Sequence, residues 1–213
     1  MIFNKTLNFI LSSGSQISVL RVLQYHKTGI TGREVARLSG LSPKTALQSL
    51  SQLEELKVVK RVIGGRDHHF TLNRDNYLIK NGVIPLLKAE NDYLPQLFVL
   101  LKKKLSQYCI SIILFGSVAR KEESITSDLD ICIILQDKKS IKIVTPIVHE
   151  LQKQIFTEYG ATLSPLYFTV ENFCKMAVQK LPPVDNIIKE GILIYGKPIR
   201  TIINGSQIRQ SQN

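Results

Sequence analysis

The stretch CISIILFGSVARKEESITSDLDICIILQ, residues 109–136, decides how this chain folds. Two apolar runs of strand length and composition flank a short polar segment. The first run ends at Gly116 and Ser117, and the second begins between two aspartates, Asp128 and Asp130. Because side chains alternate along a strand, the two carboxylates are predicted to share one face at the head of the second strand.

Two carboxylates on one face repel each other and are costly to bury, so a cation is expected between them. A hard divalent ion suits this position, since Mg2+ in phosphate chemistry takes one or two carboxylates plus substrate oxygens. Gly116 lets the backbone approach a ligand closely, and a helix starting near Ser117 would aim free N–H groups at a phosphate. Together these features predict metal-assisted nucleotidyl transfer. The alternatives are a D-x-D that merely starts a strand and a Gly-Ser that merely makes a turn.

The order of these features resembles the signature of the DNA polymerase beta-like nucleotidyltransferase superfamily, above all its minimal nucleotidyltransferases. The matching positions are Gly116-Ser117, ten residues, then Asp128-Leu129-Asp130. The A-R that follows Gly-Ser in that group is matched by Ala119-Arg120, and its E-G-x-x-x-Y-G ending by residues 190–196.

This resemblance implies a fold, a site and a reaction. The site would hold Mg2+, with Mn2+ as the alternative, on Asp128 and Asp130 as the catalytic residues. Gly116, Ser117 and Arg120 would bind a nucleoside triphosphate, with ATP as substrate or ligand. The reaction would transfer AMP from ATP to a hydroxyl acceptor, which a protein could supply.

The family's third carboxylate has no counterpart in the sequence. That residue lies on the next strand, completes the metal site and supports the base that deprotonates the attacking hydroxyl. The corresponding strand, predicted at residues 161–170, contains no Asp or Glu, and Ser164 occupies the aligned position. Glu158 and Glu171 flank this strand and could substitute only in an unusual geometry. Nucleotide binding is therefore better supported than catalysis.

The N-terminal part predicts a DNA-binding module. A helix is expected from Ser15 as its N-cap, a second after Thr31, and a third opened by Ser42 with Pro43 at its first position, running to about residue 56. Residues 58–72 read as a hairpin about a Gly-Gly turn. Two short helices joined by a turn and followed by a two-stranded wing resemble the winged helix-turn-helix of prokaryotic transcription regulators.

In that arrangement the third helix would enter the major groove of double-stranded DNA. The candidates for base contacts are Lys44, Thr45 and Gln48. On the wing, Lys60, Arg61 and Arg66 would contact phosphates. A winged helix used for protein contact is the alternative.

Composition agrees with a basic cytosolic protein. The 213 residues carry a formal net charge of +11, of which +7 falls on residues 1–90, and this favours a polyanionic partner. The sequence contains no apolar stretch of membrane-spanning length, so no membrane partner is expected. Three scattered cysteines predict reduced core thiols and a cytoplasmic location.

The expected fold class is α+β, with an N-terminal winged helix-turn-helix and a C-terminal nucleotidyltransferase-fold α/β domain on a small mixed sheet. The predicted parts are a DNA-binding domain (1–75), a helical connector (76–106), the nucleotidyltransferase-like domain (107–203) and a flexible tail (204–213). In the third part a helix is expected at residues 138–159, with Ile143, Ile147, Leu151 and Ile155 on its apolar face.

Two functions remain open on this reading. The first is a DNA-binding nucleotidyltransferase, comparable to an autoregulating antitoxin of the minimal nucleotidyltransferase class. The second is a transcriptional regulator whose nucleotidyltransferase domain only binds nucleotide. A homodimer is expected in either case, because winged helices commonly read two half-sites. A pure scaffold protein is a third possibility, but the aspartate pair of Asp128-Leu129-Asp130 would have no use in a scaffold and argues against it.

Overall fold

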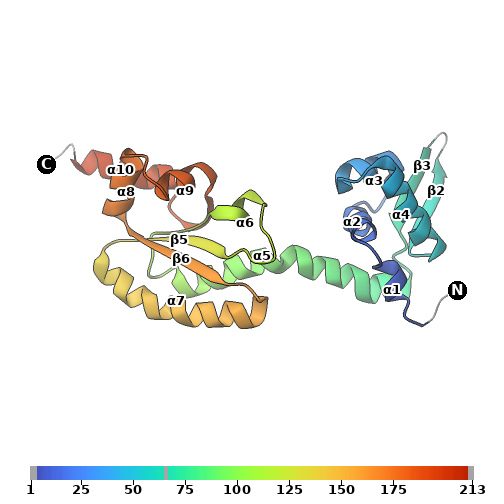
Figure 1. Ribbon diagram of the computed structural model, residues 1–213, viewed down its shortest axis with the longest axis horizontal. Helices are drawn as coiled ribbons and strands as arrows, with labels where there is room; N and C mark the ends of the chain where they lie inside the picture. Colours follow the sequence, from blue (N-terminus) through green and yellow to red (C-terminus); the bar gives the residue numbers. More distant parts are fainter. Residues whose placement is uncertain (1–3, 65–66, 211–213) are drawn as a thin grey trace. The chain divides into compact units, whose positions relative to one another are not determined.

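The computed structural model describes residues 4–64 and 67–210. The chain divides into two compact units, Met1–Tyr93 and Leu94–Asn213, and the division falls inside one helix, α5 (Ile84–Leu105) (Figure 1). Both units combine helices with a small sheet, so the fold class is α+β, as predicted. None of the helices in the described part of the chain has the length and apolarity that a membrane span requires.

The first unit packs short helices on a three-stranded sheet. Its helices are α1 (Leu7–Ile10), α2 (Gly14–Leu23), α3 (Gly32–Ser39), α4 (Pro43–Glu55) and a π-helical turn, η1 (Ile79–Val83). Its strands are β1 (Ile30–Thr31), β2 (Val59–Gly64) and β3 (Asp67–Leu72), antiparallel in the order β1-β3-β2. A helix-turn-helix with a two-stranded wing is therefore present, and β1 adds a short third strand to it.

Local capping chemistry sets where these helices begin. The Thr31 hydroxyl accepts a hydrogen bond from the backbone N–H of Glu34 at 3.2 Å, and the Ser42 hydroxyl accepts one from the N–H of Thr45 at 3.1 Å. These two caps confirm the prediction. The predicted cap of α2 was two residues late, because Ser13 rather than Ser15 accepts the N–H of Gln16.

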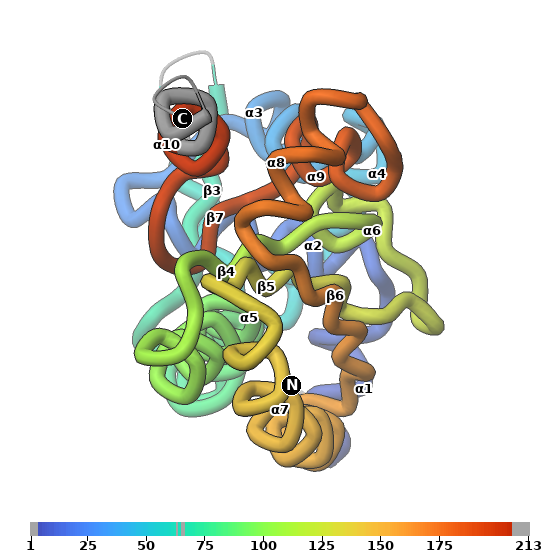
Figure 2. Tube along the Cα trace, turned by 90° about the vertical axis from the view of Figure 1, so that its left-hand side faces the viewer, coloured from blue at the N-terminus to red at the C-terminus, as the bar shows by residue number. Residues whose placement is uncertain are grey.

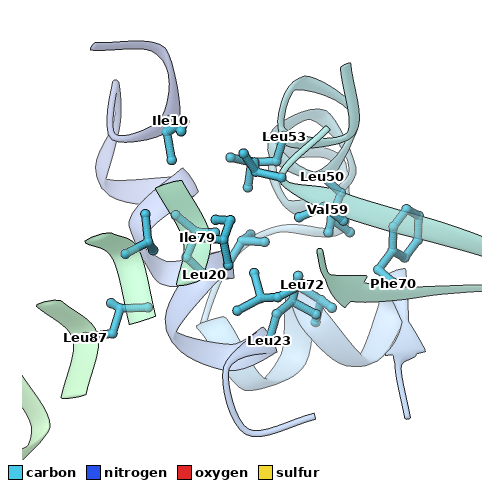
Figure 3. Packing of buried hydrophobic residues seen from close by; sticks show 14 residues of the cluster. Ile10, Leu20, Leu23, Leu50, Leu53, Val59, Phe70, Leu72, Ile79 and Leu87 are labelled. Carbon is cyan, nitrogen blue, oxygen red and sulfur yellow. The ribbon is translucent and has the colours of Figure 1, made fainter. Parts of the chain in front are cut away.

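The wing pairs in one continuous antiparallel register, from Val59 opposite Leu72 to Gly64 opposite Asp67. Its inner face joins the helices in a single apolar core, to which Leu20, Leu50 and Phe70 contribute from α2, α4 and β3 (Figure 3). Burial of these side chains stabilises the short helices, which would be only marginally stable in isolation.

The second unit is a mixed four-stranded sheet covered by helices. Its strands are β4 (Ser111–Leu114), β5 (Leu129–Leu135), β6 (Leu163–Thr169) and β7 (Ile192–Gly196), in the order β6-β5-β4-β7. The β5–β6 pair is parallel and the other two pairs are antiparallel. The helices besides α5 are α6 (Gly116–Arg120), α7 (Lys138–Tyr159), α8 (Val170–Val178), α9 (Val184–Glu190) and α10 (Ile199–Gln210).

Strand β5 separates two cores, as its alternation predicts. One face carries Leu129, Ile131 and Ile133 and packs with buried side chains of α5 and α7. The other face carries Cys132 and Ile134 and packs with α8, α9 and α10. Figure 2 shows these two groups of helices on opposite sides of the sheet. Asp130 lies on the second face, near the strand's start.

Two local expectations are corrected. The apolar face of α7 is formed by Val144, Val148, Leu151 and Ile155, while Ile143 is 56% exposed. Repeated steps of four residues drift around a helix with 3.6 residues per turn, so the predicted set leaves the core at Ile143, while Leu151 and Ile155 are buried as predicted. Helix α10 extends to Gln210 and covers most of the segment 204–213 expected to be a flexible tail.

Candidate functional site

The two aspartates lie at the start of β5, beside β6. Asp130 is half-buried and pairs in register with Ser164 on β6, whose hydroxyl hydrogen-bonds to the Asp130 carboxylate. Asp128 precedes the strand and is exposed, yet it is close enough to Asp130 to act on it electrostatically. The two predicted carboxylates therefore lie close together, with Asp130 half-buried and Asp128 exposed.

The environment of Asp130 favours a bound cation. Burial raises the pKa of the Asp130 carboxyl, and the negative charge of Asp128 raises it further. The hydrogen bond from Ser164 and the positive charge of Arg120 act in the opposite direction, but the net shift is upward. A divalent ion on the two carboxylates would relieve this cost, so the donor set fits the predicted Mg2+.

Gly116 brings the backbone of α6 against Asp130. Its φ of +75° is left-handed, and a Cβ at this position would collide with the Asp130 carboxylate. The backbone N–H of Phe115 donates to the carbonyl oxygen of Asp130 at 3.0 Å and holds the two segments together. The Gly-Ser turn and the D-x-D, ten residues apart in sequence, are thus adjacent, and only glycine fits between them.

Arg120 is engaged by two carboxylates. Its Nε donates to Glu122 at 2.8 Å, and its Nη1 donates to both carboxylate oxygens of Glu190 at 2.8 and 2.9 Å. These partners raise the pKa of Arg120, so it stays charged. Two of its nitrogens are therefore already occupied where the sequence predicts a phosphate ligand.

Glu190 is the site residue that sequence reasoning missed. Besides Arg120, its carboxylate accepts the backbone N–H of Gly116 at 3.2 Å. The signal was present in the sequence, since Glu190 opens the E-G-x-x-x-Y-G ending, but nothing local indicates a contact 74 residues away.

No third carboxylate joins the pair within the described residues, where no group of three His, Cys, Asp or Glu side chains could hold a metal. Glu171 lies in α8, beyond the far end of β6, whose last residue Thr169 is five residues from Ser164 and so roughly 16 Å away at about 3.3 Å per residue. Glu158 is exposed near the end of α7 and accepts a hydrogen bond from Gln154 at 2.9 Å. Neither residue is placed to substitute for the family's third carboxylate.

The predicted DNA-contacting residues of α4 divide into exposed and engaged side chains. Lys44 and Gln48 are exposed on one face of the helix. Thr45 is half-buried, and its hydroxyl lies 2.8 Å from that of the cap residue Ser42. Leu47, which the sequence did not suggest, is exposed on the same face as Lys44.

On the wing, the cations form ion pairs within the unit. Lys60 pairs with Asp75 at 2.8 Å and Arg61 with Glu54 at 3.1 Å. Such exposed pairs are screened by solvent and contribute little to stability, so phosphate could replace them at little cost. The third predicted wing cation, Arg66, lies outside the described residues.

Comparison with known proteins gives one family match and several slight structural likenesses. No curated protein matches the chain. Two solved structures are of MepR from S. aureus. The MepR complex with DNA is 23% identical to this chain, with a TM-score of 0.31; the match covers 45% of this chain and 79% of MepR. A mutant of MepR is 16% identical, with a TM-score of 0.34; the match covers 67% of this chain and 80% of the mutant.

A third solved structure, a toxin-antitoxin with AMP-PNP, has 15% identity, covers 57% of this chain and 90% of its own, and has a TM-score of 0.32. TM-scores of 0.31 to 0.34 are too low to support a conclusion about function. The family match is different, because it falls on the segment that contains the Gly-Ser turn and both aspartates. Residues 100–200 of this chain match the family model described as Polymerase beta, Nucleotidyltransferase.

Proposed function

We propose that the chain is a DNA-binding nucleotidyltransferase, which binds ATP with Mg2+ in its second unit and transfers AMP to a hydroxyl acceptor. The observation that carries this proposal is the contact of Gly116 with Asp130, which brings the Gly-Ser turn against the carboxylate pair. The family match of residues 100–200 supports the same reaction class.

Each residue of the site has a role in this proposal. Asp128 and Asp130 would hold the ion, which supplies Lewis-acid polarisation of phosphate oxygens when bound. Gly116 lets the backbone approach the triphosphate, and Ser117 adds its N–H and hydroxyl. Arg120 would face phosphate charge only with the nitrogen that is held by neither Glu122 nor Glu190.

Transfer would form a bond between the acceptor oxygen and the α-phosphorus while the bond to the β-phosphate oxygen breaks and pyrophosphate leaves. The acceptor must also lose its proton. Beside Asp130, β6 offers a Ser164 hydroxyl, which is a poor base at neutral pH. Deprotonation therefore falls to solvent, and we expect slow turnover. The same observation favours a second candidate function, a regulator that binds nucleotide without transferring it.

Removing both aspartates is expected to abolish Mg2+-dependent ATP binding. The Asp128→Ala plus Asp130→Ala protein should bind ATP at least ~100-fold more weakly by calorimetry, because no other carboxylate among the described residues is positioned to hold the ion. With α-labelled ATP and a cell lysate, any labelled acceptor seen with the native protein should disappear.

A matched control is Glu150→Gln plus Glu158→Gln, which removes two exposed carboxylates from α7 and leaves the site intact. Aspartate-dependent label supports the enzyme. Aspartate-dependent ATP binding without any label supports the nucleotide-binding regulator. ATP binding that persists in the aspartate variant would overturn both.

We also propose that the first unit binds double-stranded DNA through α4 and the wing, as a homodimer that reads two half-sites. The affinity for DNA should fall steeply with salt concentration, with a log–log slope of about −0.9 for each phosphate contacted.

Lys44→Ala plus Gln48→Ala should weaken binding at a selected operator by about 1–3 kcal/mol for each lost base contact. Lys60→Ala should instead lower affinity for all sequences alike and reduce the salt slope by about 1.

Fluorescence anisotropy against a selected duplex and a scrambled duplex measures both effects. Lys142→Ala, an exposed lysine on α7, is the matched control and should leave DNA affinity unchanged. Failure to bind any duplex at low salt would contradict the proposal, as would a loss of affinity in the control equal to that of the α4 variant.

A further inference from the structure

Helix α6 carries the Gly-Ser turn and is too short to be stable without contacts to the rest of the unit. It comprises five residues, none of them fully buried, and its N-cap residue Phe115 makes no side-chain capping hydrogen bond. Isolated helices of this length are not stable in water. Val118 and Ala119 add partial packing on the sheet. The position of Gly116 and Ser117 therefore depends on contacts from elsewhere in the chain.

Glu190 supplies a contact at each end of α6. One carboxylate oxygen accepts the N–H of Gly116, the first residue of the helix, at 3.2 Å. Both oxygens accept from Nη1 of Arg120, the last residue, at 2.8 and 2.9 Å. The Glu190 side chain is only 22% exposed, which strengthens these charge-assisted bonds relative to surface pairs.

The placement of Glu190 is not explained by its own helix. It is the last residue of α9, where the helix macrodipole favours a cation over a carboxylate. The neighbouring Lys189 pairs with Asp185 at 2.6 Å instead of with Glu190. The favourable partners of the Glu190 carboxylate therefore lie in α6.

Gly191 brings Glu190 close to α6. A Cβ at Gly191 would collide with the carbonyl oxygen of Ile187 in α9 and would press against the Ile113 side chain in β4. Glycine therefore lets α9 end directly against the strand that leads into α6. The two adjacent residues thus act together: Gly191 permits the close approach of α9 to β4, and Glu190 makes the contact with α6.

From this geometry we infer that Glu190 is a positioning residue of the candidate site. Its carboxylate contacts both ends of α6 and so keeps Gly116 against Asp130. The inference rests on the proposed nucleotide binding and assigns Arg120 chiefly to the clamp. A carboxylate that merely occupied the phosphate position would have the reverse effect, because its removal would tighten nucleotide binding.

The test compares two carboxylates that share Arg120. Glu190→Ala removes the clamp, and Glu190→Gln keeps one neutral acceptor. Glu122→Gln neutralises the other partner of Arg120 without touching Gly116. By calorimetry with Mg2+ and ATP, Glu190→Ala should weaken binding about 10–100-fold and Glu190→Gln by less, as for other supporting residues of metal sites. Glu122→Gln should stay within about twofold of the native protein.

A purely structural role would not produce the next two results. Arg120→Gln combined with Glu190→Ala should weaken ATP binding no more than the larger single change does, because both substitutions break the same ion pair between Arg120 and Glu190. Exchange of the Gly116 amide proton, measured by NMR without nucleotide, should be faster in Glu190→Ala and unchanged in Glu122→Gln. Native or tighter ATP binding by Glu190→Ala would overturn the inference.

The two proposals fail in different ways. If the native protein does not bind ATP with Mg2+, the proposed function fails, and the Gly116 amide exchange still decides whether Glu190 clamps α6. If the native protein binds ATP through its aspartates and Glu190→Ala binds equally well, only the inference fails. Unchanged Gly116 exchange in Glu190→Ala likewise overturns the clamp.

Discussion

Gly116→Ala is expected to lower the affinity for Mg2+ and ATP by on the order of 100-fold while the fold persists. The left-handed φ of +75° costs a non-glycine residue roughly 1–2 kcal/mol, and the added Cβ would displace the Asp130 carboxylate. Changes that disturb the groups supporting a metal ligand typically cost about 10–100-fold in metal affinity. Calorimetric titration with ATP and a urea unfolding curve measure the two effects separately.

Gly160→Ala is the matched control for this change. Gly160 also has a left-handed φ, of +61°, and lies in the same unit as the C-cap of α7, but a Cβ there meets nothing within 4 Å. It should therefore lower stability by about 1 kcal/mol without changing ATP affinity. If Gly116→Ala binds ATP as well as Gly160→Ala does, the close approach of Gly116 and Asp130 does not matter for binding.

Ser164→Asp is expected to raise the rate of AMP transfer by roughly 10²–10⁴-fold, if the missing base limits the reaction. Ser164 is opposite Asp130 in the parallel β5–β6 register, so an aspartate there would stand beside the carboxylate pair. Single-turnover transfer from α-labelled ATP to the acceptor measures the rate. Ser164→Asn, which has the same shape without the charge, should leave the rate at the native level.

The same substitution should make stability depend more strongly on pH and Mg2+. The pKa of Asp130 is already raised in the folded protein, and a third carboxylate would raise it further. The folded state then holds this proton more tightly than the unfolded chain, so stability falls as pH rises from the ordinary aspartate range through the raised pKa. Mg2+ should restore the stability at neutral pH.

For the rate experiment, equal rates of AMP transfer by the Ser164→Asp and Ser164→Asn variants would show that a missing base is not what limits transfer.

Much of the local structure was predictable because its causes are local. Thr31 and Ser42 cap their helices through hydrogen bonds that span three residues, and Gly160 ends α7 in a left-handed conformation. The alternation along β5 separates its two cores for the same reason, since neighbouring side chains of a strand must point to opposite faces. Such features depend on a few consecutive residues.

Contacts between distant residues could not be read in the same way. Lys60 and Arg61 were expected to be available to DNA, yet each pairs with a carboxylate that only the folded unit brings close. The apolar face of α7 was predicted correctly at Leu151 and Ile155 but not at Ile143, because a pattern of four-residue steps allows a small rotation of the helix that the core does not. Packing against a particular surface selects one rotation of the helix, and the sequence pattern alone does not contain that surface.

The candidate site shows where this boundary lies. The sequence by itself determined the Gly-Ser turn, the paired Asp128 and Asp130 on one strand face, and the serine where a third carboxylate was expected. Only the tertiary structure decided that Gly116 contacts Asp130 and that Glu190, 74 residues away, joins both ends of α6. The physical reason is that turn and strand conformations follow from neighbouring residues, whereas side-chain contacts across a site depend on how separate elements pack.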